Sequence, residues 1–141
     1  MEDSENRGPK IGKFFLGGLL AGILGALVNN IYSFLYTSIT GFSIPKIIHL
    51  GSITSASILL VVVSSLFYFV LAKFSSKAKL IYIIVGIIFM IFSFWAPLSS
   101  HLPDGTPTPE GFAGLTLPMH VISGLLAFIL IPWHVDRKDD I

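Results

Sequence analysis

Among the polar side chains within the apolar segments of this 141-residue chain, four have the types and positions that could do chemistry. An amide and a hydroxyl can each donate and accept hydrogen bonds, and a neutral imidazole does both through its two nitrogens. An imidazole also exchanges a proton near neutral pH, which suits general acid–base chemistry. Such a set predicts either a binding pocket or hydrogen bonds that hold helices together. The four residues are Asn29, Ser52, Ser93 and His120.

The composition excludes several other classes of function. The chain has no cysteine, which rules out disulfides, thiol redox chemistry and thiolate metal sites. No Asp, Glu, Lys or Arg lies within the apolar segments, so a proton pump or ion-coupled transporter would lack its usual groups. The net charge is +1 without a long basic run, so we expect no nucleic-acid partner. The spacing of His101, Asp104, Glu110 and His120 matches no metal-ligand signature, so we assign no metal site. We also assign no cofactor and no catalytic residue.

The elements that must position these residues are predicted from the apolar segments. Hydrophobic residues make up 53% of the chain and charged residues 12%, which is typical of a polytopic membrane protein. A helix of ~20 residues crosses a ~30 Å hydrocarbon core. We therefore predict an all-α fold, a transmembrane bundle of four helices in one domain. The expected spans are residues 14–36, 47–72, 80–98 and 115–133, with tails at 1–13 and 134–141.

The ends of the spans carry further signals. Ser43 before Pro45 and Thr116 before Pro118 have the pattern of a helix start, with a capping hydroxyl and a proline in the first turn. The first span is too long for the apolar part of a cleaved signal peptide, so we expect it to be retained. Every basic residue except Lys46 lies in the tails or in the loop between the second and third spans. The positive-inside rule then places both termini in the cytoplasm and residues 99–114 in an external loop.

Depth along the spans brings the four polar residues together. Counted from the span ends, Asn29 and His120 each lie ~8 Å below the outer edge of the hydrocarbon core. Ser52 and Ser93 lie within about two turns of that level. Asn29 and His120 also belong to rows of small residues, which bring membrane helices close together. We expect the four residues to line a polar pocket in the outer leaflet.

Three short motifs resemble a known family. The first span runs into VNN at 28–30, the third ends in SFWAPLSS at 93–100, and the fourth begins with LPMHVISG at 117–124. With these motifs the chain resembles a family of small bacterial four-helix integral membrane proteins of unknown function, over most of residues 14–133. The resemblance implies four spans and a multi-pass location in the bacterial inner membrane. It implies no activity and no functional residue.

Three hypotheses of function follow. The leading one is a membrane protein that binds a small or amphipathic molecule, or a membrane partner, through the outer-leaflet pocket. The first alternative is a membrane-embedded enzyme that acts on a lipophilic substrate with His120 as acid and base. The second is a pore or assembly subunit that forms homo-oligomers through the small-residue pair Gly18 and Gly22, although packing within one chain is the more usual role of such a pair. The expected partners are the lipid bilayer, a small lipophilic ligand and, for the last alternative, further copies of the chain.

Overall fold

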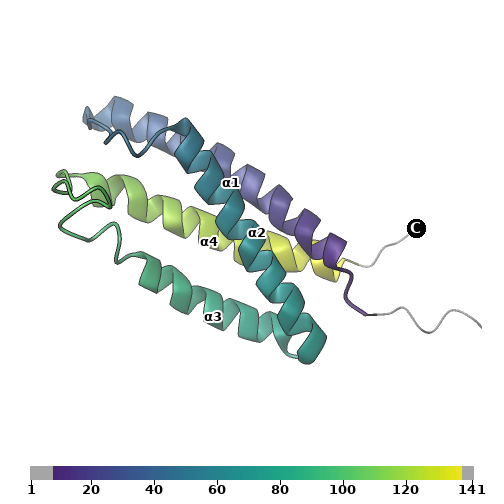
Figure 1. Ribbon diagram of the computed structural model, residues 1–141. Coiled ribbons are helices and arrows are strands. Elements are labelled where there is room, and N and C mark those ends of the chain that lie inside the picture. Colours follow the sequence, from purple (N-terminus) through teal and green to yellow (C-terminus); the bar gives the residue numbers. More distant parts are fainter. Residues whose placement is uncertain (1–7, 138–141) are drawn as a thin grey trace, which may run out of the picture.

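The computed structural model describes residues 8–137, which form four helices lying alongside one another (Figure 1). In chain order these are α1 (Ile11–Thr40), α2 (Leu50–Phe74), α3 (Ala78–Ser93) and α4 (Phe112–Asp136). Helices α1, α2 and α4 are long and apolar enough to cross a membrane. The expected all-helical fold of four helices is confirmed, and the three long apolar helices support a membrane protein. The outer parts of the two expected tails, residues 1–7 and 138–141, lie outside the described residues.

The two ends of the bundle differ in charge. The described chain ends and the α2–α3 loop lie at one end, and the other two loops lie at the opposite end, here called the loop end (Figure 1). Helix α1 packs along α2 and α4, whereas α3 lies against α2 and α4 and does not contact α1. The end with the chain ends and the α2–α3 loop is called the basic end because of its cations, Lys10, Lys13, Lys73, Lys77, Lys79 and Arg137.

Large apolar side chains cover the outward faces of the helices. Phe34 is 69% exposed, Leu59 is 64% exposed and Ile129 is 62% exposed. A contiguous apolar surface of this kind is unfavourable in water but matches the acyl chains of a bilayer. The outward faces are therefore those expected of a membrane protein.

The interior consists of two apolar clusters with a polar layer between them. Phe14 and Tyr82 belong to the cluster near the basic end, and Ile53 and Leu115 belong to the cluster near the loop end. Between the clusters, α1, α2 and α4 each contribute one polar side chain to the same level. These residues are Asn29, Ser57 and Ser123.

Two glycines of α1 let α2 approach it closely. A β-carbon on Gly22 would lie 2.9 Å from the Cα of Ile58, and a β-carbon on Gly18 would lie 2.2 Å from the Oγ of Ser65. These spaces are too small for a side chain, so α2 of the same chain occupies the Gly18–Gly22 face. This is the intrachain packing favoured from the sequence.

The expected cap of the second helix at Ser43 is wrong. The helix begins at Leu50, and His49 is its N-cap. The Nδ1 of His49 accepts from the N–H of Ser52 at 3.3 Å, and the Oγ of Ser52 accepts from the N–H of His49 at 2.9 Å. Because this reciprocal capping box satisfies two backbone donors, the helix starts there. Pro45 belongs to a separate turn before it.

The expected cap of the fourth helix at Thr116 is also wrong. The helix begins at Phe112, and the hydroxyl of Thr116 donates to the carbonyl of Phe112 at 2.8 Å. Pro118 therefore lies inside the helix, where its missing N–H leaves the carbonyl of Gly114 without its helical partner. The hydroxyl of Tyr32, on α1, donates to that carbonyl at 2.6 Å. A contact between helices thus compensates for the internal proline.

The third helix ends at Ser93, before the expected span end at Leu98. Pro97 has no N–H, and its ring would clash with the carbonyl of Ser93 if the helix continued. The N–H groups of Phe94 and Trp95 instead bond to carbonyls three residues back, the tighter 3₁₀ pattern. The 16 residues of α3 span ~24 Å, less than a ~30 Å hydrocarbon core.

Candidate functional site

The polar layer is held together by the side chain of Asn29. Its Nδ2 donates to the Oγ of Ser57 at 3.0 Å and to the Oγ of Ser123 at 2.9 Å. One amide on α1 therefore bonds to α2 and to α4. Asn29 is 2% exposed, and its Oδ1 is buried without a hydrogen-bond partner among residues 8–137.

Asn30 bonds to fewer helices than Asn29 does. Its Nδ2 donates to the carbonyl of Ala26 on its own helix at 2.8 Å and to the hydroxyl of Thr54 on α2 at 3.0 Å. Asn30 is only partly buried. Of the two asparagines, Asn29 therefore lies in the centre of the bundle, where it is hydrogen-bonded to both α2 and α4.

The other three predicted site residues have separate surroundings. Ser52 belongs to the capping box at the start of α2. The hydroxyl of Ser93 donates to the carbonyl of Met90 at 2.6 Å, within the last turn of α3. His120 is half-buried and makes no hydrogen bond within the described part of the chain. No hydrogen bond among the described residues joins Asn29 to any of these three, so a common binding pocket stays a prediction.

Ser93 and His120, two of the four predicted site residues, lie at the same level of the bundle. A β-carbon on Gly86 would meet the ring of Phe128, and a β-carbon on Gly124 would meet the Sδ of Met90. These contacts set the antiparallel register of α3 and α4. Extended by one turn, the same register places His120 of α4 level with the end of α3, where Ser93 lies. A groove of about 710 Å³ at this end is lined by Ile91, Phe92, Phe94, Trp95, Leu98, Ser99 and Ser100.

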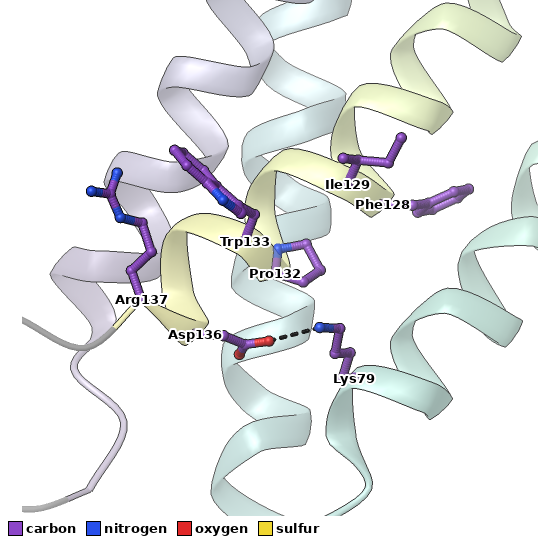
Figure 2. Close-up of a pocket in the computed structure, with 7 residues that line it drawn as sticks. All are labelled: Lys79, Phe128, Ile129, Pro132, Trp133, Asp136 and Arg137. Atoms are coloured by element: carbon purple, nitrogen blue, oxygen red, sulfur yellow. Dashed lines mark hydrogen bonds and ion pairs between the residues drawn. The ribbon is translucent and has the colours of Figure 1, made fainter.

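A second cleft lies between α3 and α4 at the basic end (Figure 2). It has a volume of about 390 Å³. Six of its seven lining residues come from the last turns of α4 and the residue that follows, and the seventh comes from the first turn of α3. The lining residues are Lys79, Phe128, Ile129, Pro132, Trp133, Asp136 and Arg137.

Charges of both signs meet at one end of this cleft. The Nζ of Lys79 lies 2.9 Å from the Oδ2 of Asp136, and about half of each side chain is exposed. The guanidinium carbon of Arg137 lies 4.6 Å from the centre of the Trp133 ring, a cation–π distance. The hydroxyl of Tyr68 lies 3.5 Å from the Oδ1 of Asp136. A molecule in the cleft would therefore meet two cations, one anion and an aromatic ring.

Sequence reasoning missed this cleft. The sequence analysis places Trp133 at the end of the fourth span, Lys79 in the loop between the second and third spans, and the residues from His134 onward in a tail. Antiparallel neighbours bring the start of one helix beside the end of the other, so Lys79 and Asp136 could have been paired from the predicted topology. The volume between them depends on side-chain packing, for which the sequence has no local signal.

The expected external loop, residues 99–114, ends at Gly111 because α4 begins at Phe112, and it is folded back on itself. The N–H of Leu102 donates to the carbonyl of Thr106 at 2.8 Å, and Leu102 is buried. The Oδ1 of Asp104 accepts from the hydroxyl of Thr106 at 2.6 Å and from its N–H at 3.0 Å. These bonds hold the pKa of Asp104 below its usual value, because they favour the ionised carboxylate. Among residues 8–137, no three histidine, aspartate or glutamate side chains are grouped as metal ligands would be.

Comparison with known proteins gives no match: no family model, no curated protein and no solved structure corresponds to this chain. Its function must therefore be inferred from its own residues. The basic-end cleft and the loop-end groove are two concave surfaces that could hold a ligand, and the first combines charged, aromatic and aliphatic groups.

Proposed function

We propose that this is a four-span protein of the bacterial inner membrane, with both termini in the cytoplasm, that binds an amphipathic molecule in the cleft between α3 and α4. The cations of the basic end support this orientation, because positively charged residues are retained on the cytoplasmic side. Phe89 and Phe92 are at least 70% exposed, which supports placing α3 in lipid as well. The turn that follows α3 would supply the length that its 16 residues lack. The membrane assigned follows from the resemblance to the bacterial family.

The order of side chains along the cleft carries the proposal. Ile129 and Phe128 lie toward the middle of the bundle, Trp133 lies one turn nearer its end, and Asp136 and Arg137 lie at the end itself (Figure 2). An amphipathic molecule has the same order, from an apolar tail to a polar headgroup. Because tryptophan favours the boundary between lipid and water, Trp133 marks where the two parts of such a molecule would meet.

A second candidate is binding, or acid–base chemistry on a lipophilic substrate, at the loop end. His120 favours it, because this half-buried imidazole makes no hydrogen bond among the described residues and lies level with Ser93. Replacing His120 by glutamine keeps a polar side chain but removes the titratable group. A bound molecule or an activity lost in H120Q and kept in W133A would favour this candidate over the basic-end cleft.

The proposal is tested by native mass spectrometry of the protein released from lipid nanodiscs. We expect the wild type to retain a co-purifying amphipathic molecule and W133A to lose at least nine-tenths of it. The matched control is W95A, since Trp95 is an exposed tryptophan that lines the groove at the opposite end of the bundle. Equal retention in W133A and W95A, or loss in W95A alone, would overturn the assignment to the basic-end cleft.

A further inference from the structure

The charged end of the α3–α4 cleft is built for a ligand that carries both signs of charge. Lys79 and Asp136 are already paired at 2.9 Å, so their charges largely cancel. Arg137 adds a third charge one residue beyond Asp136. Figure 2 shows Lys79 beside Asp136, and Arg137 on the other side of the last turn of α4 with its guanidinium beside Trp133.

Arg137 is placed to bind a phosphate. Its guanidinium lies over the ring of Trp133 and makes no ion pair with any carboxylate among residues 8–137. The contact with the ring leaves the planar fork of N–H donors at the edge of the guanidinium accessible. A guanidinium fork matches two oxygens of a phosphate group, and such bidentate bonds are among the strongest in proteins.

Asp136 can accept a further donor. Its Oδ2 accepts from Lys79, whereas its Oδ1 has a long contact of 3.5 Å with the hydroxyl of Tyr68. A carboxylate has about four acceptor positions, and about half of this side chain is exposed. A primary ammonium would find a charge-assisted acceptor here, whereas a headgroup without a cation has no donor of this kind to offer Asp136.

The apolar wall defines the rest of the ligand. Ile129 is 62% exposed and lies about two turns from Arg137, on the side toward the middle of the bundle. An acyl chain that follows this wall would place its headgroup at the level of Asp136 and Arg137. The tail, the phosphate and the ammonium then each meet a group of matching chemistry.

We propose that the cleft binds an aminophospholipid such as phosphatidylethanolamine, with the lipid phosphate on Arg137 and the primary ammonium on Asp136. This inference rests on the proposed function, because it assigns a ligand class to the same cleft. It adds a preference among headgroups, which binding of amphipathic molecules in general does not require.

The test uses delipidated full-length protein and three dioleoyl lipids with ethanolamine, choline or glycerol headgroups, titrated by native mass spectrometry. Choline keeps the positive charge but has no N–H, and the glycerol headgroup has no cation. We expect phosphatidylethanolamine to bind about tenfold tighter than either of the others, the effect of one hydrogen bond between charged groups. The variant D136N should abolish this preference, and R137Q should weaken binding of all three lipids.

Two further variants test the cause of the headgroup preference. They distinguish the Asp136 carboxylate itself from its ion pair with Lys79 and from the overall positive charge of the basic end. K79Q breaks the same ion pair as D136N but keeps the carboxylate, so phosphatidylethanolamine should still bind tighter than the other two lipids. The control is K73Q, since Lys73 is a cation of the same end that lies over the ring of Phe69, outside the cleft. K73Q should leave the three affinities unchanged.

The outcomes distinguish the two proposals. Equal affinity for the three lipids, with all of them weakened by W133A, would overturn the headgroup inference and leave the proposed function standing. A preference for phosphatidylglycerol that D136N does not alter would likewise overturn the inference. Binding of all three lipids that W133A does not affect would overturn the proposed function together with it.

Discussion

The amide nitrogen of Asn29 lies 2.9 Å from the hydroxyl oxygen of Ser123, so the first helix is hydrogen-bonded to the last across the middle of the bundle. The same nitrogen bonds to Ser57 of α2. This polar layer separates two apolar clusters. Apolar surfaces can slide past one another in lipid at little cost, whereas a buried amide must find its partners. The layer therefore sets the register of α1, α2 and α4.

Replacing Asn29 by alanine should destabilise the protein by about 1–2 kcal/mol, because hydrogen bonds between membrane helices contribute up to this amount. The measurement is equilibrium unfolding in mixed detergent micelles. N30A is the matched control, because Asn30 joins α1 to α2 alone and has its second bond within its own helix. A loss in N30A as large as in N29A would argue against a special role of the polar layer. Ligand binding unchanged in N29A would leave the residue a packing role only.

The glycine face of α1 makes a second prediction. G22A should destabilise the protein by about 1–3 kcal/mol, because the new methyl group would press on the backbone of Ile58. G12A is the control, since a β-carbon on Gly12 has nothing within 4 Å, and it should change the stability by less than ~1 kcal/mol. Thermal unfolding in detergent and the oligomeric state in nanodiscs are measured together. Unchanged stability with loss of an oligomer in G22A would show that this face joins separate chains instead.

The helical bundle could be predicted from the sequence because long uncharged apolar runs have few alternatives to membrane helices. Asn29 could also be singled out from the sequence, because an amide within an apolar run needs a hydrogen-bond partner. Its partners Ser57 and Ser123 were missed, although both lie at its depth, because serines are common in membrane helices and can bond to their own backbone. The partner of each amide depends on the rotation of the helices, which depth alone does not define.

The helix starts show a different limit. Ser43 and Thr116 each precede a proline by two residues, yet neither caps its helix. His49 and Ser52 have the three-residue spacing of a capping box and cap α2 more completely than one hydroxyl would. Pro118 is tolerated inside α4 because Tyr32, distant in the sequence, bonds to the freed carbonyl. Such contacts determine where the helices start, rather than the local pattern of a hydroxyl before a proline, because they satisfy more backbone donors and acceptors.

Asp104 gives a prediction of pH dependence. Its pKa is lowered in the folded loop by the hydroxyl and the N–H of Thr106, so its contribution to stability is present above its ordinary value and is lost as the pH falls through the lowered pKa. Carbon-detected NMR titration of the carboxyl group measures it. T106V removes the hydroxyl and keeps the N–H, so the pKa should rise part of the way toward its usual value of 3.8. T108V is the control and should not move it, because Thr108 makes no side-chain bond to Asp104; equal titration curves for T106V and the wild type would refute the assigned cause.

The bond from Tyr32 to the carbonyl of Gly114 predicts a coupling with Pro118. Y32F should destabilise the protein by about 1 kcal/mol, since it removes the donor that bonds to the carbonyl of Gly114. In the P118A background, the new N–H of residue 118 can donate to the same carbonyl, so Y32F should cost less there. A double-mutant cycle of unfolding free energies measures this difference. Y36F serves as the control, because Tyr36 donates to Gly111, whose carbonyl already accepts the N–H of Leu115, so its cost should be the same with or without Pro118. Equal costs of Y32F in both backgrounds would show that the hydroxyl does not substitute for the missing helical bond.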